Sequence, residues 1–240
     1  MSHSLVQYES IIRLSVFFGI LVLMAAWEWF APRRAQTIGR LQRWPNNLGI
    51  VALNTVLVRL ALPTAAVGVA LAADAHSWGI FHLLEVPHWV AVVLSLLLLD
   101  LAIYLQHVLF HAVPTLWRLH RMHHTDLEFD VTTGARFHPL EIFLSMTIKL
   151  SVVSALGAPP IAVLIFEVVL NATSLFNHGN VSLPLVLERM LRWIVVTPDM
   201  HRVHHSVVPR ETNSNYGFNL PWWDRLLGTY GRASADNDRH

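Results

Sequence analysis

Long apolar runs separated by short polar segments dominate the pattern of this chain. A helix that crosses a bilayer needs about 20 predominantly apolar residues. Arg59 and Pro63 interrupt the second of five such runs, and the last two runs are the shortest. The runs are Leu14 to Ala31, Leu48 to Ala73, Trp89 to Phe110, Leu140 to Leu156 and Ile161 to Phe176. The pattern predicts an all-α integral membrane protein.

The last two runs are separated by Gly157-Ala158-Pro159-Pro160. Glycine and proline at adjacent positions favour a tight reversal of the chain, so we expect a helical hairpin. Its arms are short, and they dip into the bilayer or cross it. The predicted architecture is a helical membrane bundle of three spans plus this hairpin.

Composition supports a membrane protein and excludes several other classes. Charged residues make up 14% and hydrophobic residues 54% of the 240 positions, whereas soluble domains average about 25% charged residues. The net charge is only +1 and no basic run is long, so we expect no nucleic-acid partner. The absence of cysteine excludes disulfides, zinc knuckles, iron–sulfur clusters and cysteine-ligated haem.

Basic residues predict how the spans are oriented, because cytoplasmic loops are enriched in lysine and arginine. The segment from Asp74 to His88 has neither residue. The loop after the first run carries four arginines: Arg33, Arg34, Arg40 and Arg43. That loop is expected to be cytoplasmic, so the third run ends on the cytoplasmic side with His107 and His111. The hairpin then leaves His178 on the same side.

Histidines carry the candidate chemistry. Ten lie between His107 and His205, and nine of them form four tight groups: His107 and His111; His120, His123 and His124; His178; and His201, His204 and His205. Residues three or four apart share a helix face, and neutral imidazole is the commonest metal ligand near pH 7. Nine such ligands suit two metal ions, each with four or five nitrogens and an open position. The other histidines outside these groups are expected to be structural: His3, His76, His82, His88 and His240.

Polar residues near the histidines are candidates for orienting the ligands, since a ligating imidazole usually donates its second N–H to a carboxylate or carbonyl. Asp100 and Tyr104 share a helical stripe with His107. Glu167 and Asn171 form a similar stripe before His178, although interhelical hydrogen bonds would explain those two equally well. The remaining candidates are Asp126, close after the second group, and Asp199, before the fourth.

Ligand type alone does not select the metal, because all-imidazole sites suit zinc, copper, iron or nickel. A closed structural zinc site needs only four ligands. Nine or ten ligands with flanking carboxylates in a membrane indicate a reactive dinuclear centre instead. A redox metal there could activate O2 against a lipid C–H bond.

The histidine groups and several other segments resemble the fatty acid hydroxylase superfamily, also called the sterol desaturase family. The further matching segments are Arg136-Phe137-His138-Pro139-Leu140-Glu141, Asn177-His178-Gly179-Asn180, Asn215-Tyr216-Gly217, and Trp223-Asp224-Arg225-Leu226-Leu227-Gly228-Thr229-Tyr230. The likeness extends from about Leu96 to Tyr230. It implies a non-haem di-iron membrane oxygenase in which the nine grouped histidines are metal ligands and catalytic residues, with His138 as a tenth candidate ligand.

The resemblance also implies cofactors and partners. We expect two iron ions, which zinc could replace in a purified sample, together with O2 and a lipid substrate of the fatty acyl, sphingoid or sterol type. The chain has no dinucleotide fingerprint, so electrons must come from a separate reductase, ferredoxin or cytochrome. This donor is expected to dock near a group of arginines: Arg118, Arg121, Arg202 and Arg210.

These expectations divide the chain into three parts. Residues 1–90 form N-terminal transmembrane helices and loops, residues 91–232 a histidine-box catalytic domain with a cytoplasmic helical cap, and residues 233–240 a disordered tail. Other enzymatic outcomes on the same scaffold are desaturation, ether-lipid cleavage and carotenoid oxygenation; a non-enzymatic metal carrier is less compatible with ligands gathered on one side. The sequence selects no oligomeric state.

Overall fold

The computed structural model describes residues 2–62, 64–126 and 128–232. The predicted disordered tail, residues 233–240, lies outside this range. Across the described residues the chain is helical and forms no β-strand, which confirms the predicted all-α class. The elements are α1 Ser2–Phe30, α2 Arg40–Ala61, α3 Ala65–Ala75, α4 Ile80–Leu83, α5 His88–Ala112, α6 Pro114–His124, the 3₁₀ helix η1 Thr133–Ala135, α7 Pro139–Leu156, α8 Pro160–Asn177, α9 Leu185–Leu191, α10 Pro198–His204, α11 Pro209–Thr212 and α12 Trp222–Leu226.

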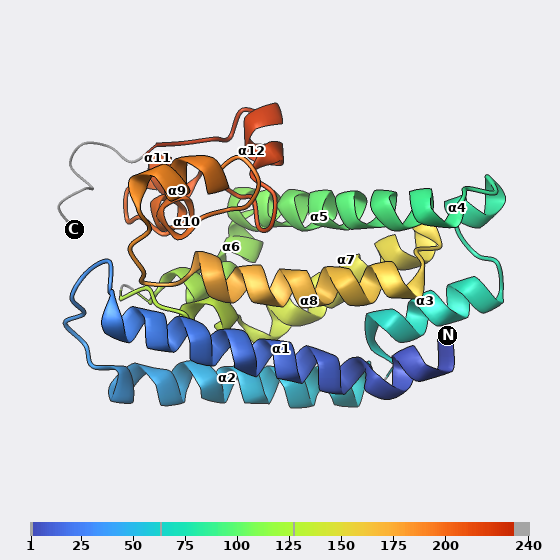
Figure 1. The fold of residues 1–240 in the computed structure, drawn as a ribbon, viewed down its shortest axis with the longest axis horizontal. Coiled ribbons are helices and arrows are strands. Elements are labelled where there is room, and N and C mark those ends of the chain that lie inside the picture. The colour runs from blue at the N-terminus through green and yellow to red at the C-terminus, as the bar shows by residue number, and fades with distance from the viewer. Residues whose placement is uncertain (1, 63, 127, 233–240) are drawn as a thin grey trace.

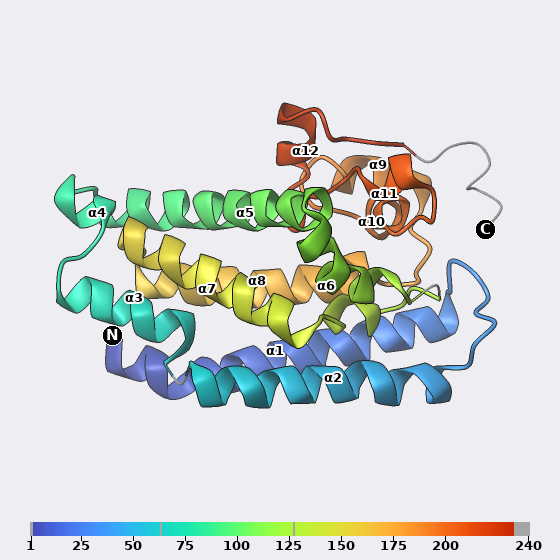
Figure 2. The same ribbon diagram turned by 180° about the vertical axis from the view of Figure 1, so that it is seen from behind.

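Long helices run side by side along one axis and short helices gather at one end (Figures 1 and 2). Within the described residues, five segments are long and apolar enough to cross a membrane: Tyr8–Phe30, Arg40–Leu83, His88–Ala112, Pro139–Leu156 and Pro160–Asn177. Large apolar side chains such as Leu41 and Leu60 point outward from α2, as they would toward lipid. The chain therefore has the character of an integral membrane protein.

The second apolar run differs from the continuous span that its length suggests. The helix begins earlier, at Arg40, and ends at Ala61, and a separate helix α3 begins at Ala65. Leu62 has φ −132° and ψ 67°, outside the helical region. Pro63 follows it in the sequence, and a residue before proline is disfavoured in the helical region.

The predicted hairpin is present, and its helices α7 and α8 match the two short apolar runs to within a residue. Gly157 ends α7 with a positive φ of 66°, a conformation that glycine adopts without strain. A Cβ added at Gly79, before α4, would lie only 2.1 Å from the Gly157 nitrogen. Two glycines thus let the α4 turn pack tightly against the hairpin.

The main hydrophobic core joins α3, α5, α7 and α8. Small residues of α3, including Ala66 and Ala70, are fully buried there, so the helices approach closely, as is common in membrane bundles. The core includes Phe166 and packs against Leu170. These two residues therefore fill helix–helix contacts.

Both figures show the histidine-bearing ends of α5, α6, α8 and α10 near the α1–α2 loop, away from α4. α1 packs against α8, and α3 packs against α7 and α8. The N-terminal helices thus form part of the same bundle as the histidine-bearing helices.

Candidate metal centre

Nine histidines converge in two adjacent groups, within each of which the nitrogen ligand atoms lie within 4.8 Å of one another. We call them the five-histidine group and the four-histidine group. The first contains His107, His111, His120, His124 and His204, and the second contains His123, His178, His201 and His205. Chain segments up to about a hundred residues apart in the sequence therefore meet at one place.

Each His-x-x-His-His motif supplies both groups. His120 and His124, four residues apart on α6, enter the five-histidine group, while His123 between them enters the other. The second motif does the reverse and gives only its middle histidine, His204, to the five-histidine group. The three histidines of a motif were expected to lie on one helix face and to meet at one site. Instead, each motif contributes histidines to two neighbouring groups. Rings of His124 and His205 stack across the boundary with centroids 4.3 Å apart.

The four-histidine group is centred on His178. Its Nδ1 lies 2.7 Å from the carbonyl oxygen of Ser174, and a carbonyl can only accept, so this nitrogen carries the ring proton. Its Nε2 lies 3.0 Å from Nε2 of His123, 3.0 Å from Nε2 of His201 and 3.2 Å from Nε2 of His205. A neutral His178 thus directs a bare lone pair at three other imidazole nitrogens.

Burial keeps these imidazoles neutral. It lowers the pKa of His178 to about 3, and the pKa of His123, His201 and His205 falls well below its ordinary value for the same reason, reinforced by the neighbouring imidazoles. The Nδ1–H of His123 donates to the Arg136 carbonyl at 3.2 Å. His123 and His178 therefore face each other with unprotonated Nε2 atoms, which repel unless a cation lies between them.

In the five-histidine group, two imidazoles likewise donate from Nδ1 to backbone carbonyls and keep Nε2 unprotonated. His107 donates from Nδ1 to the Tyr216 carbonyl at 2.8 Å, and His204 donates from Nδ1 to the Ser214 carbonyl at 2.7 Å. Nε2 of His107 is 3.1 Å from Nε2 of His120, while Nε2 of His204 is buried without a hydrogen-bond partner. Burial also lowers the pKa of His120 and His204 well below its ordinary value. Both groups therefore fit metal ions bound by neutral imidazoles.

Glu141 is a site residue that the sequence reasoning did not select. Its Oε1 lies 2.6 Å from Nδ1 of His120, and both side chains are buried. The carboxylate thus orients a ligand of the five-histidine group. The sequence did contain a signal for Glu141, which lies near the start of an apolar helix and within a segment that resembles the family. An acidic residue in such a helix is costly without a partner.

His138, the tenth candidate ligand, lies outside both groups. Its Nδ1 accepts a hydrogen bond from the backbone N–H of Leu140 at 3.1 Å. This side chain caps the first turn of α7.

Five of the six polar residues expected to orient ligands bond elsewhere in the described structure. Asp100 accepts from the Trp223 indole at 2.8 Å, and the Tyr104 hydroxyl pairs with Thr229. Glu167 pairs with Lys149, and Asp126 with Arg43. Asp199 lies 3.3 Å from Arg33, and Asn171 is a half-buried residue of α8. Through their contacts with Trp223 and Thr229, Asp100 and Tyr104 hold the C-terminal segment against α5.

That C-terminal segment positions the carbonyl that binds His107. Asp224 is fully buried and accepts from the backbone N–H of Tyr216 at 2.8 Å and of Gly217 at 2.7 Å. A Cβ on Gly217 would approach the Asp224 carboxylate to 2.7 Å. The Asn-Tyr-Gly and Trp-Asp segments of the closing signature therefore interlock beside the five-histidine group.

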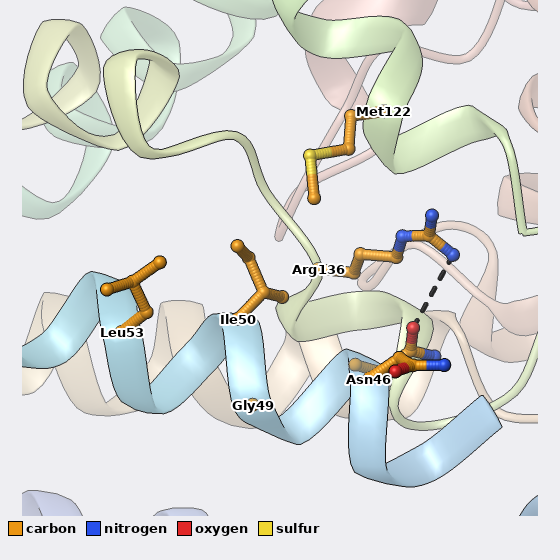
Figure 3. Close-up of a pocket in the computed structure, with 7 residues that line it drawn as sticks. Asn46, Gly49, Ile50, Leu53, Met122 and Arg136 are labelled. Atoms are coloured by element: carbon orange, nitrogen blue, oxygen red, sulfur yellow. Dashed lines mark hydrogen bonds between the residues drawn. The ribbon is translucent and has the colours of Figure 1, made fainter. Parts of the chain in front are cut away.

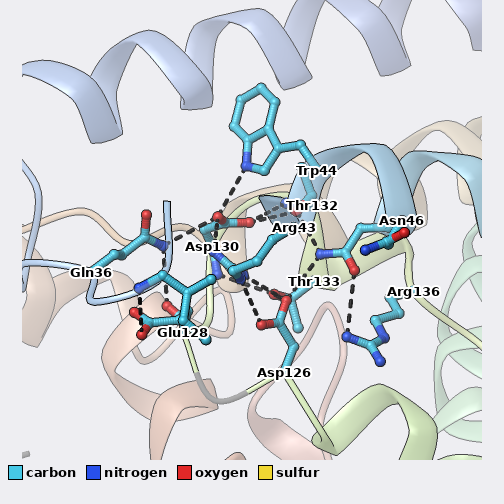
Figure 4. Close-up of polar contacts among 12 residues, drawn as sticks. Gln36, Arg43, Trp44, Asn46, Asp126, Glu128, Asp130, Thr132, Thr133 and Arg136 are labelled. Carbon is cyan, nitrogen blue, oxygen red and sulfur yellow. Dashed lines mark hydrogen bonds and ion pairs between the residues drawn. The ribbon is translucent and has the colours of Figure 1, made fainter. Parts of the chain in front are cut away.

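The loop after α6 is clamped to α2 by a buried ionic network (Figure 4). Arg43 donates from Nε and Nη2 to the two oxygens of Asp126 at 2.9 and 2.6 Å, and from Nη1 to Asp130 at 2.6 Å. Asn47 donates to Asp126 at 3.0 Å and to Thr132 at 2.9 Å. Burial alone would raise the pKa of Asp126, but Arg43 holds that pKa below its ordinary value.

Helix α1 fixes a second part of the site through Glu28. This buried carboxylate accepts from the backbone N–H of Val131 at 2.7 Å and of Asn180 at 2.8 Å. Val131 lies in the loop before η1, and Asn180 lies two residues after His178. The first 90 residues, which show no family signature, thus hold two site segments in register.

The predicted docking arginines do not all lie on the surface. Arg118, Arg121 and Arg210 are exposed. The guanidinium nitrogens of Arg202 are buried, and its Cζ lies 4.9 Å from the centre of the Phe129 ring. Arg202 therefore belongs to the packing around the four-histidine group, not to an open basic surface.

Comparisons with known proteins find relatives that are named hydroxylases and monooxygenases. Ornithine lipid hydroxylase OlsE of Rhizobium tropici is 35% identical over 67% of this chain and 46% of its own length. Alkylglycerol monooxygenase of Xenopus tropicalis is 26% identical over 88% of this chain and 44% of its own length. Human cholesterol 25-hydroxylase is 29% identical over 60% of this chain and 52% of its own length.

The chain therefore spans about half the length of these curated relatives. No solved structure matches it. A model of the family described as fatty acid hydroxylase matches residues 92–229, which include all nine grouped histidines. The chain belongs to the fatty acid hydroxylase family.

Proposed function

We propose that this protein is a membrane-bound oxygenase that hydroxylates a C–H bond of a lipid, with two iron ions held by the five- and four-histidine groups. The observation that carries the proposal is the convergence of unprotonated Nε2 atoms around His178 and between His107 and His120. Bound iron would supply O2 activation. The protein holds the ligands in one tautomer and shields them from water.

The relatives named above act on different lipids by name, and each name denotes hydroxylase or monooxygenase activity. This supports the insertion of one oxygen atom into a lipid. The balanced reaction combines the lipid R–H with O2, two electrons and two protons, and yields R–OH and water. The electrons come from a separate reductase, ferredoxin or cytochrome.

The arrangement of the bundle supports a cytoplasmic active site. The arginine-rich α1–α2 loop and the histidine groups lie at the same end (Figure 1), and such loops face the cytoplasm. Exposed Arg118 and Arg121 are on α6, the helix that carries His120, His123 and His124. An acidic electron donor approaching these arginines would come close to the metal ligands, with an affinity that weakens as salt increases.

An ether lipid is a second candidate substrate, because alkylglycerol monooxygenase aligns with 88% of this chain. Desaturation on the same ligand set is a different outcome, in which the lipid loses two hydrogens instead of gaining oxygen. Metal transport is less compatible with ligands that gather at one end of the bundle than with ligands spread along its length.

The test combines metal content with lipid mass. Purified protein should contain two equivalents of a transition metal, and membranes that express it with a competent electron donor should contain a lipid heavier by one oxygen. His123→Ala and His204→Ala, one change in each histidine group, should each remove metal and the product. His88→Ala, an exposed histidine at the far end of the bundle, is the matched control.

Full turnover by the His123→Ala, His204→Ala double variant would refute the site assignment. A lipid that is lighter by two hydrogens would replace hydroxylation with desaturation. Metal binding without a change in any lipid, despite active electron supply, would refute the oxygenase proposal and favour metal transport.

A further inference from the structure

A pocket of about 300 Å³ lies between α2, α6 and the segment before α7, outside both histidine groups (Figure 3). Its wall includes Asn46, Gly49, Ile50, Leu53, Met122 and Arg136. The polar residues lie at the end of α2 nearest the histidine groups, and Ile50 and Leu53 lie further along the helix. The pocket thus changes from polar to apolar in the direction that leads into the bilayer.

The polar-to-apolar order along the pocket matches that of a membrane lipid, which has its headgroup at the interface and its acyl chains in the bilayer. Arg40 and Arg43 mark the interfacial end of α2, and Asn46 is one turn further on. Leu53 is 46% exposed, and the outer face of α2 continues with exposed apolar residues such as Leu60. One wall of the pocket therefore opens onto the surface that faces lipid tails.

Arg136 gives the polar end of the pocket its charge. Its guanidinium hydrogen-bonds two neutral groups, the Asn47 amide at 3.5 Å and the Thr125 hydroxyl at 3.1 Å. A cation held by neutral partners at a membrane interface suits the charge of an anionic headgroup. The backbone carbonyl of Arg136 is the acceptor for Nδ1–H of His123. The same residue therefore joins the pocket to the four-histidine group.

We infer that this pocket is a binding site for an anionic membrane lipid, with its phosphate at Arg136 and one acyl chain along Ile50 and Leu53. Charge and polarity both select this occupant. A neutral lipid would leave the guanidinium with neutral partners only, and a free anion would not use the apolar wall. The site is distinct from the iron ligands, and lipid binding there does not depend on turnover.

A larger side chain at Gly49 should fill the pocket without a steric clash at its Cβ. A Cβ at this position would meet no atom within 4 Å, so Gly49→Leu places its side chain in open space on the pocket wall. Leucine also favours the helix interior more than glycine. Gly19→Leu is the matched control, because Gly19 lies in α1, outside the pocket, and its Cβ would likewise meet nothing within 4 Å. Arg136→Gln removes the charge, and Arg121→Gln is its exposed control.

The experiment is native mass spectrometry of the detergent-purified full chain, titrated with phosphatidylglycerol or with phosphatidylcholine of the same acyl chains. Wild type should retain phosphatidylglycerol with about tenfold preference. Arg136→Gln should abolish that preference, and Gly49→Leu should lower retention of both lipids. Gly19→Leu and Arg121→Gln should behave like wild type.

Equal retention of the two lipids by wild type would overturn the inference, and so would wild-type preference in both pocket variants. Displacement of phosphatidylglycerol by millimolar inorganic phosphate would also overturn it, because the pocket would then be a simple anion site. The metal and lipid-mass measurements that test the oxygenase proposal are independent of these outcomes.

Discussion

The two histidine groups share motifs but differ in what surrounds the imidazoles. In the four-histidine group, His123 and His178 donate to backbone carbonyls, and His123 stacks on the Phe137 ring with centroids 4.3 Å apart. In the five-histidine group, His120 faces the buried carboxylate of Glu141. One group is thus oriented by neutral carbonyls and an aromatic ring, and the other also includes a buried carboxyl group.

This difference predicts two unequal metal ions. A carboxylate that accepts an imidazole N–H raises the basicity of the ligand and stabilises the bound cation, whereas a carbonyl mainly fixes orientation. The five-histidine group also has one more ligand. We therefore expect the four-histidine group to release its metal first. The changes below test the comparison, beginning with the largest expected effect.

His178→Ala should remove the centre of the four-histidine group, since Nε2 of His178 lies within 3.2 Å of three other imidazole nitrogens. Metal content should fall from two equivalents to one, and lipid turnover should fall by roughly a thousandfold, the equivalent of about 4 kcal/mol. Elemental analysis and product mass measure the two effects. Retention of both equivalents would refute the role of His178 as a ligand of the four-histidine group.

Asp126→Ala should affect both groups, because it breaks the clamp that holds the loop after α6. Arg43 would remain buried with Asp130 as its acidic partner. Breaking a buried pair costs about 3–5 kcal/mol, and the lower end is expected because Asp130 remains. Thermal unfolding in detergent should show a clear fall in melting temperature, accompanied by loss of both metals.

Asp199→Ala is the matched control for the clamp. Asp199 pairs with Arg33 at 3.3 Å, both side chains being partly exposed at 31% and 44%, and makes a longer contact of 4.0 Å with Nε of Arg202. Such pairs contribute about 0–1 kcal/mol, so its melting temperature should stay near that of wild type. Equal effects of the two alanine changes would refute the role assigned to the clamp.

Local spacing made much of this molecule predictable. The apolar runs and the Gly157–Pro160 reversal predict α7 and α8 closely, because both signals lie within the segments that fold. The histidine motifs identify the residues that the structure brings together. Their division between two groups was not predictable from spacing, because His123 and His204 are directed by contacts with Arg136 and Ser214 from other segments.

Long-range polar partners explain the remaining differences. Asp126 looked like a ligand-orienting residue, yet its partner Arg43 lies 83 positions earlier. Asp100 appeared to face His107 along one helix, but it bonds Trp223, 123 positions later. Sequence periodicity shows which residues share a helix face, whereas these pairings depend on how separate helices and loops meet.

Glu141→Gln should weaken only the five-histidine group, because the amide keeps the shape at His120 and replaces the carboxyl group that accepts from it. Loss of such an outer partner typically costs 10- to 100-fold in metal affinity. Titration with a chelator should then release one equivalent earlier than in wild type, and the order of release of the two ions should reverse. Unchanged release of both equivalents would contradict the role of the carboxylate.

Among these changes at ligand-orienting residues, Asn213→Ala should lower metal affinity the least. Its Oδ1 lies 3.3 Å from Nδ1 of His111, a longer contact than the 2.6 Å between Glu141 and His120. Loss of a neutral hydrogen bond costs about 0.5–1 kcal/mol, so metal affinity of the five-histidine group should fall two- to fivefold. A loss as large as that of Glu141→Gln would mean that orientation of His111, and not the Glu141 carboxyl group beside His120, distinguishes the two groups.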